Sequence, residues 1–165
     1  MRAPRLQKQG LPTFSWDFDL IGINQELMKS GNREEDKEKL PDKDLSSCVI
    51  NAAIQVHKAL GPGFLESLYE EALCIELASG NIPFERQKSI RLTYQGKSIG
   101  EHRLDLLVAG RLVVELKAIK DLESIHFSIV RSYMKAVDVD SGLILNFAAM
   151  PLTVKRVGRE HPNPS

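Results

Sequence analysis

Two neighbouring strand-like runs carry charged residues in a pattern that suits metal chemistry. Asp105 lies in an apolar run that ends at Val108. The next run begins at Leu112 and contains Glu115 and Lys117. A three-residue turn between the runs would pair Val108 with Leu112. Counting back along both strands, Asp105 then falls directly opposite Glu115, with Cβ atoms about 5 Å apart. Two carboxylates this close repel each other unless a positive charge lies between them.

Divalent cations are the positive charges that such a site commonly takes. Mg²⁺ binds through few carboxylates and keeps several waters, so Mg²⁺ or Mn²⁺ at Asp105 and Glu115 would remove the repulsion. Alternation of side chains puts Asp105 on one strand face with Leu107, and puts Lys117 on one face with Glu115. From there Lys117 is expected to orient or deprotonate a water, or to stabilise negative charge that develops on a phosphate.

A plain salt bridge is the alternative explanation for these charges. Glu115 and Lys117 would then pair with each other and with Asp105 on a solvated face. The other positions of both runs are nearly all Leu or Val, so both faces of these strands are predicted to be largely buried. Buried charges need a partner or a metal. The pattern alone leaves the salt bridge and the metal site both open.

Glu66 is a third candidate carboxylate. At about 100° per residue, Glu66 falls between Leu73 and Leu77 at the edge of the apolar face of a helix, whereas Glu70 and Glu71 turn outward. We therefore predict that Glu66 points at the sheet. An acid in the first turn also interacts well with the helix dipole, and that explanation is sufficient by itself.

Turn signals divide the chain into helices and strands. Gly-Pro-Gly at residues 61–63 and Gly-Asn-Ile-Pro at residues 80–83 end two helical patterns. We predict helices at 44–60, 65–79 and 122–137, and strands at 84–94, 98–108, 112–118 and 143–147, with a further edge strand at 152–157. This order describes an α/β fold with a mixed central sheet flanked by helices.

Length and composition set the class of protein. The 165 residues are enough for one compact domain, and the 22 basic and 22 acidic residues balance, which argues against wholesale electrostatic wrapping of nucleic acid. Cys48 and Cys74 have no pairing motif, so we expect unpaired thiols in a reducing compartment. No apolar run is long enough to span a membrane, and we expect a cytoplasmic protein.

Residues 1–44 differ from the rest of the chain. Aromatic and polar residues alternate at 14–20, and residues 29–44 contain five basic and six acidic residues with almost nothing to bury. We expect an N-terminal extension or linker outside the core. Alternatively, the aromatic segment pairs with a sheet edge in this protein or in a partner. The domain proper is predicted at 45–158, and a disordered tail at 159–165.

Several blocks of the sequence follow one another in a recognisable order. Residues 63–69 read Gly-Phe-Leu-Glu-Ser-Leu-Tyr, and Asp105, Glu115 and Lys117 have a D…ExK spacing. The first pattern resembles the one that names the GxxExxY protein family, and the second resembles the PD-(D/E)XK nuclease superfamily to which that family is assigned. Further similar blocks are HKALGPG at 57–63, PFERQ at 83–87, RLD at 103–105 and VELKA at 114–118. The resemblance covers about residues 45–157.

The resemblance implies a restriction-endonuclease-like core. It implies Asp105 and Glu115 as metal ligands, Glu66 as an additional acidic residue of the metal site, and Lys117 as the catalytic lysine. It also implies Mg²⁺ or Mn²⁺ as the cofactor and DNA as the substrate. One position departs from similar proteins, which tend to carry a glutamine in the third helix. This sequence has Ile129 there, and its side chain cannot hydrogen-bond.

Basic residues of the predicted sheet are candidates for contact with nucleic acid. Residues 85–120 contain eight basic and four acidic residues, so this region is net +4. Arg86, Lys88 and Arg103 are positioned as phosphate-tracking side chains would be. An ordinary solvated strand face is the alternative. Tyr69, three residues after Glu66, either contacts a phosphate or fills the core.

Three functions are compatible with these patterns. The first is a divalent-metal-dependent nuclease that hydrolyses phosphodiester bonds in DNA. The second is a catalytically inactive nuclease-like fold that binds nucleic acid or protein, which Ile129 and the balanced charge favour. The third is a protein whose aromatic N-terminal segment mediates assembly, and a homodimer is left open.

Overall fold

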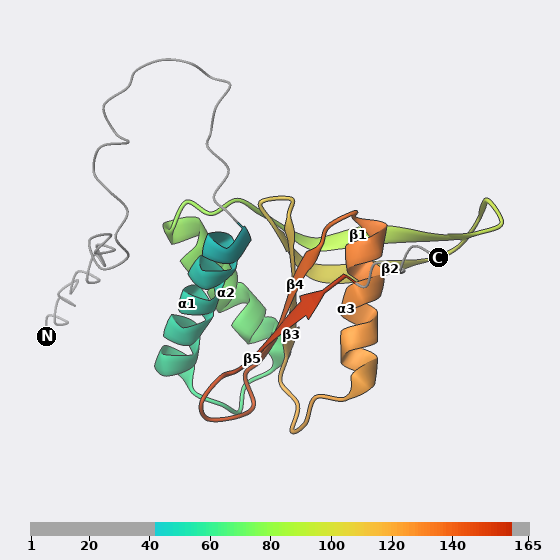
Figure 1. Cartoon of the computed structure of the whole chain (residues 1–165). Helices are drawn as coiled ribbons and strands as arrows, with labels where there is room; N and C mark the ends of the chain where they lie inside the picture. The colour runs from blue at the N-terminus through green and yellow to red at the C-terminus, as the bar shows by residue number, and fades with distance from the viewer. Residues whose placement is uncertain (1–41, 160–165) are drawn as a thin grey trace, which may run out of the picture. The chain divides into compact units, whose positions relative to one another are not determined.

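The structure is a computed structural model that describes residues 42–159 (Figure 1). These residues contain helices α1 (Asp42–Leu60), α2 (Glu66–Ser79) and α3 (Ser124–Ala136), and strands β1 (Phe84–Tyr94), β2 (Lys97–Val108), β3 (Leu112–Lys117), β4 (Ser141–Asn146) and β5 (Thr153–Gly158). The predicted elements are confirmed in type and order. The predicted extension at 1–44 and the predicted tail at 159–165 lie almost wholly outside the described residues.

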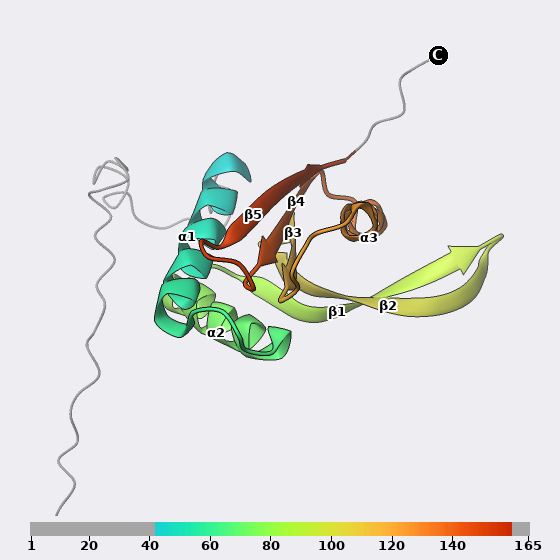
Figure 2. The same cartoon turned by 90° about the horizontal axis from the view of Figure 1, so that it is seen from below.

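The five strands form one mixed sheet in the order β1-β2-β3-β4-β5. Strands β3 and β4 are parallel, and the other neighbours are antiparallel. Helix α3 connects the two parallel strands, as a parallel pair requires. Helices α1 and α2 cover one face of the sheet and α3 covers the other (Figures 1 and 2). The predicted α/β fold with a mixed central sheet flanked by helices is therefore confirmed.

Each face of the sheet has its own hydrophobic cluster. The cluster beneath α1 and α2 contains Leu106, Val114 and Leu116, and the cluster beneath α3 contains Leu107 and Val113. Residues that alternate along β2 and β3 thus face opposite layers, which is why these strands read as continuous apolar runs. Strands β2 and β3, which carry Asp105 and Glu115, are therefore packed against helices on both faces of the sheet.

The close packing of α3 depends on a glycine in β4. A Cβ atom at Gly142 would lie 2.8 Å from both Met134 Sδ and Val130 Cγ1. Real Cβ atoms do not approach other atoms so closely, so the absence of a side chain at Gly142 sets how near α3 lies to the sheet.

Strands β1 and β2 form a hairpin of 11 and 12 residues, much longer than the six-residue strands β3, β4 and β5. The far half of this hairpin projects beyond the rest of the sheet (Figure 2). Strand β2 therefore leaves β3 part-way along its length, and the candidate site lies at that point.

Two smaller expectations concern the thiols and the membrane. Cys48 and Cys74 are both free, as predicted, although Cys48 is only half-buried. None of the helices in the described part of the chain combines the length and the apolar content that a membrane span needs.

Candidate active site

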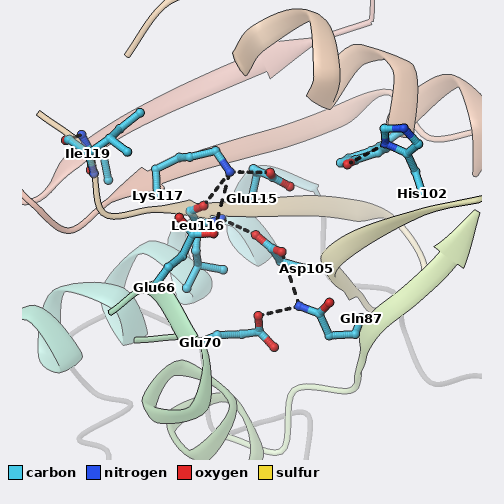
Figure 3. A network of polar contacts seen from close by, with 11 residues as sticks. Glu66, Glu70, Gln87, His102, Asp105, Glu115, Leu116, Lys117 and Ile119 are labelled. Carbon is cyan, nitrogen blue, oxygen red and sulfur yellow. Dashed lines mark hydrogen bonds and ion pairs between the residues drawn. The ribbon is translucent and has the colours of Figure 1, made fainter. Parts of the chain in front are cut away.

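The candidate site begins where β2 separates from β3. The predicted pairing of Val108 with Leu112 is present, and the ladder continues for two further residue pairs. Beyond the ladder the Asp105 side chain takes the place of a backbone partner, because the Leu116 N–H donates to Asp105 Oδ2 at 2.8 Å. The predicted direct pairing of Asp105 with Glu115 is not part of the ladder. Asp105 instead lies against β3 through its bond to Leu116, near enough to Glu115 to feel its charge (Figure 3).

The simple alternation of side chains fails at Asp105. Leu104 and Leu107 are three residues apart, yet both pack in the cluster beneath α3. The interruption coincides with one in the neighbouring strand, where Gln87 has a φ of +50° and, with Asp105, is skipped in the β1–β2 ladder. Because the alternation is interrupted between Leu104 and Leu106, the sharing of a face by Asp105 and Leu107 stays a prediction. The Asp105 carboxylate points toward β3, where it accepts the Leu116 N–H.

Glu115 and Lys117 lie in the last half of β3 and are paired with each other. Lys117 Nζ donates to Glu115 Oε1 at 2.6 Å and to the carbonyl oxygen of Leu116 at 3.0 Å. Glu115 is only 6% exposed, and its second oxygen, Oε2, is buried with no hydrogen-bond partner among the described residues. The salt bridge considered as an alternative is thus present, but it satisfies one carboxylate oxygen only.

Glu66 reaches the same centre from α2. It is the first residue of that helix, and its Oε1 lies 3.9 Å from Lys117 Nζ (Figure 3). Its side chain is 41% exposed, so it lies at the solvent side of the cluster. The prediction that Glu66 points at the sheet is confirmed.

Two of the carboxylates, Asp105 and Glu115, have raised pKa values, and burial is the largest cause for both. Burial, and then the charge of Glu115, raise the pKa of Asp105 to about 7, although the Leu116 N–H bond opposes the shift. Burial also raises the pKa of Glu115, against the hydrogen bond from Lys117. A further positive charge beside these acids would lower both pKa values.

Lys117 is held in its charged form. Burial alone would lower the pKa of Lys117, but the hydrogen bond to Glu115 and the negative charges of Glu115, Glu66 and Asp105 outweigh it and raise the pKa. Lys117 therefore carries a proton at neutral pH and is suited to face a negative charge, rather than to accept a proton.

Helix α3 contributes residues that the sequence analysis did not select. His126 lies close enough to Glu115 to oppose the rise in the pKa of that carboxyl. Its Nδ1 accepts the Glu123 N–H at 2.9 Å in the helix N-cap. Burial and the charges of Glu115 and Asp105 raise the pKa of Tyr133, whose hydroxyl lies 3.4 Å from His102 Nδ1. The spacing of seven residues between His126 and Tyr133 places both on one helix face and was the available signal.

Glu70 does not lie where the sequence predicted. It was expected to turn outward, but it is 5% exposed and accepts a hydrogen bond from Gln87 Nε2 at 2.6 Å. Glu70 precedes Leu73 by three positions and Leu77 by seven, so helical spacing puts all three on the buried face of α2. Arg86 and Gln87 of β1 bind its carboxylate, and the spacing of residues within α2 does not reveal these partners.

Asn146 fixes the segment that follows Lys117. Asn146 ends β4 and is 2% exposed; its Nδ2 donates to the Ile119 carbonyl at 2.7 Å, and its Oδ1 accepts the Ile119 N–H at 3.1 Å. These two bonds hold the chain just beyond the catalytic-lysine candidate, so the end of β3 is firmly positioned.

Tyr69, a candidate for nucleic-acid contact, lies in the core. Its ring is fully buried and stacks on Phe147 with centroids 4.4 Å apart. Its hydroxyl donates to the Gly61 carbonyl at 2.7 Å and accepts the Phe64 N–H at 3.1 Å. Of the two alternatives for Tyr69, the structure has the core-filling one, and Tyr69 pins the Gly-Pro-Gly turn before α2.

The basic candidates differ in their surroundings. Arg86 is paired with two glutamates of α2, and Lys88 Nζ lies 2.8 Å from Glu85 Oε2. Arg103 lies on β2 two residues before Asp105 and is exposed. Arg103 is thus the candidate with the most accessible charge near the carboxylates.

A family model described as the PD-(D/E)XK nuclease superfamily matches residues 43–157, the segment that carries the D…ExK residues. The chain belongs to the PD-(D/E)XK nuclease superfamily. Proteins of the superfamily are nucleases, which act on nucleic acid and in general use divalent metals. Comparison with curated protein sequences found no significant match.

Solved structures give a weaker likeness. The structure described as "Crystal structure of SSO0001" is 15% identical in sequence and has a TM-score of 0.46. The match covers 58% of this chain and 50% of that chain, so this chain spans about half the length of that protein.

Because the superfamily in general uses divalent metals, the question is whether the residues of this site suit a divalent cation. Among residues 42–159, no group of three or more His, Cys, Asp or Glu side chains is already arranged to hold an ion. Of the predicted ligands, Glu115 and Glu66 instead pair with Lys117, and Asp105 accepts the Leu116 N–H. Two observations nevertheless fit an ion: Glu115 Oε2 is buried without a donor among the described residues, and the pKa values of Asp105 and Glu115 are raised, chiefly by burial. A divalent cation would correct both.

Proposed function

We propose that this chain is a Mg²⁺- or Mn²⁺-dependent nuclease that hydrolyses phosphodiester bonds in DNA, and that it belongs to the GxxExxY family of the PD-(D/E)XK superfamily. The observation that carries the proposal is the buried, donor-free Glu115 Oε2 beside a second carboxylate, Asp105, with a raised pKa. Nuclease activity would reside in residues 45–158.

The metal ligands in this proposal are Asp105, Glu115 and Glu66. Asp105 and Glu115 belong to adjacent strands; Glu115 is buried and Asp105 half-buried, so they supply the more rigid part of the site, whereas the more exposed Glu66 supplies an adjustable one. When bound, the ion would polarise the phosphate and lower the pKa of the attacking water.

Lys117 acts in its charged form. Its ammonium group is fixed by Glu115 and by the Leu116 carbonyl at the open end of β3. A cation that is already oriented stabilises the negative charge that develops on the phosphate oxygens without further reorganisation. Of the roles considered for Lys117, the raised pKa favours this one over deprotonation of water.

DNA as substrate rests on the family resemblance and on the charge of the region around the site. Residues 85–120 are net +4, and the exposed Arg103 lies on the strand that carries Asp105. Arg86 and Lys88 would contribute only after exchanging their present carboxylate partners, so Arg103 is the first candidate for a phosphate contact.

Metal binding and cleavage test the proposal separately. Mn²⁺ should raise the melting temperature of the wild type, and Glu115→Gln should abolish that rise. Glu71→Gln is the matched control, because Glu71 is an exposed glutamate of α2 outside the carboxylate group. Cleavage of single- and double-stranded DNA and of RNA, with and without chelator, then tests activity. Absence of both the Mn²⁺ shift and cleavage would contradict the proposal.

A second function has its own supporting observation. Ile129 replaces the glutamine of similar proteins and packs against the apolar cluster beneath α3, so it gives the site no polar group. We therefore keep a catalytically inactive nuclease-like fold that binds nucleic acid or protein as the alternative. A Mn²⁺ shift without cleavage of any nucleic acid would favour this alternative.

A further inference from the structure

A chain of polar contacts links the middle of α2 to Asp105 (Figure 3). Gln87 Nε2 donates to Glu70 Oε2 at 2.6 Å and lies 3.5 Å from Asp105 Oδ1. Glu70 is buried and is also bound by Arg86 Nε. The other oxygen of Asp105, Oδ2, accepts the Leu116 N–H at 2.8 Å. The two oxygens of Asp105 are thus approached by donors from β1 and β3 respectively.

The backbone of Gln87 is unusual for its position. Its φ of +50° lies in the left-handed region, which residues other than glycine rarely adopt. The residues on either side, Arg86 and Lys88, pair normally with β2, so the departure is confined to Gln87 and the facing Asp105. Strain of this kind persists where surrounding contacts enforce it, and it is concentrated at functional sites.

An amide suits this place because its two N–H groups serve two carboxylates without adding charge. One N–H is taken by Glu70 at 2.6 Å, and the other is available to Asp105 at the longer distance of 3.5 Å. Glu70 also lies one helical turn after Glu66 on the same side of α2. The contact between Glu70 and Gln87 therefore also helps to fix α2, and with it Glu66, relative to Asp105.

We propose that Gln87 is a positioning residue whose amide, anchored by Glu70, fixes the orientation of the Asp105 carboxylate. The significance of that orientation rests on the proposed function, in which Asp105 and Glu66 are metal ligands. Gln87 itself touches neither substrate nor ion in this proposal. It acts through Asp105, as residues that hydrogen-bond to metal ligands commonly do.

Two substitutions test the role. Gln87→Gly removes the amide and accommodates a φ of +50° without strain. Glu70→Ala removes the anchor and leaves both Gln87 and Asp105 in place, which keeps the test decisive if one variant folds poorly. Glu71→Gln is the control, because Glu71 pairs with the outer side of Arg86 and does not contact Gln87.

Two measurements are needed, one of them free of metal. Hydrogen exchange of the Leu116 amide, whose acceptor is Asp105 Oδ2, reports whether that carboxylate is held. We expect this amide to exchange about tenfold faster in both variants, while amides elsewhere in β2 and β3 keep their rates. We expect Mn²⁺, titrated by electron paramagnetic resonance, to bind about tenfold more weakly in both variants. The control should match the wild type in both measurements.

Several results would overturn the proposal. Unchanged Leu116 exchange in both variants would do so, as would an equal acceleration throughout β2 and β3, which indicates a structural role only. Wild-type Mn²⁺ affinity in both variants would also overturn it. If the wild type binds no Mn²⁺, the proposed nuclease function fails, whereas selective acceleration at Leu116 still supports the positioning of Asp105 by Gln87.

Discussion

The ammonium group of Lys117 lies 2.6 Å from Glu115 Oε1, and the two side chains project from the same strand two residues apart. The salt bridge and the metal site, which the sequence presents as alternatives, are therefore compatible. One oxygen of Glu115 is bound by Lys117, and the other is buried without a donor. Lys117 neutralises part of the carboxylate charge when no ion is bound, and this relationship makes its removal informative.

Substitution of Lys117 should separate metal binding from catalysis. In Lys117→Met we expect cleavage at saturating Mn²⁺ to fall by at least about 100-fold, since a fixed charge that stabilises the transition state is lost. Mn²⁺ should bind no more weakly than in the wild type, because the cation that competes for Glu115 is gone. Cleavage rates and a Mn²⁺ titration measure the two effects.

The control for this experiment is Lys120→Met, which removes an exposed lysine three residues further along the chain. It should retain wild-type cleavage within a few-fold. Wild-type cleavage by Lys117→Met would remove Lys117 from the catalytic role, and a large loss of Mn²⁺ affinity would contradict its description as a competitor for Glu115.

The stability of the metal-free protein should depend on Asp105 and pH. Burial and the charge of Glu115 raise the pKa of Asp105 to about 7, whereas an unfolded chain has an aspartate pKa of about 4. Between these values the folded state binds more protons than the unfolded state, so the free energy of unfolding decreases as pH rises from about 4 to about 7. Solvent screening reduces the effect to the order of 1–2 kcal/mol.

Asp105→Asn should remove this slope while keeping an oxygen for the Leu116 N–H. At pH 8 the metal-free variant should be more stable than the metal-free wild type, and it should lose the Mn²⁺-induced rise in melting temperature. Urea unfolding in the presence of chelator at pH 5.5 and pH 8 measures the slope. A wild-type protein that is equally stable at both pH values, or that becomes more stable at pH 8 to the same extent as the variant, contradicts the assignment.

The sequence predicts most of the fold because its signals are local. The Gly-Pro-Gly turn and the apolar runs define the elements, and the three-residue turn fixes the pairing of Val108 with Leu112. Register then brings Asp105 to β3, as counted from the turn. The interruption of the side-chain alternation at Asp105 was not predictable in this way, because it coincides with an unusual backbone at Gln87 in another strand.

The polar surroundings of the site were less accessible to the same reasoning. Glu70 has the helical spacing of a buried residue, but an acidic residue is expected to face solvent unless a partner for its charge is known. Its partners, Arg86 and Gln87, lie on β1, and the spacing of residues within α2 does not show that β1 is a neighbour. His126 and Tyr133 likewise approach the carboxylates only through the packing of α3 on the sheet.

Tyr69 should contribute to stability and not to the site. Tyr69→Phe keeps the ring that stacks on Phe147 but loses the hydroxyl bonded to Gly61 and to Phe64. Loss of these bonds in a buried place should lower the free energy of unfolding by about 1–3 kcal/mol, while Mn²⁺ affinity is unchanged. Tyr94→Phe is the control, since Tyr94 is 65% exposed. Equal melting temperatures of Tyr69→Phe and the wild type would show that the hydroxyl contacts are unimportant.

The distance between α3 and the sheet should be set by Gly142. In Gly142→Ala the new methyl group would meet Met134 Sδ and Val130 Cγ1 at 2.8 Å. Met134 is flexible, but a valine in a helix has one strongly preferred rotamer, so α3 itself must shift. We expect a loss of about 1–3 kcal/mol in the free energy of unfolding. Adding Val130→Ala should recover part of that loss, because it removes one of the two clashing groups.

The control for this substitution is Gly158→Ala, where a Cβ meets nothing within 4 Å and which should change stability little. Since α3 carries His126 and Tyr133, Gly142→Ala should also alter the resonances of both side chains, and an unshifted α3 with wild-type stability would contradict this account of the packing.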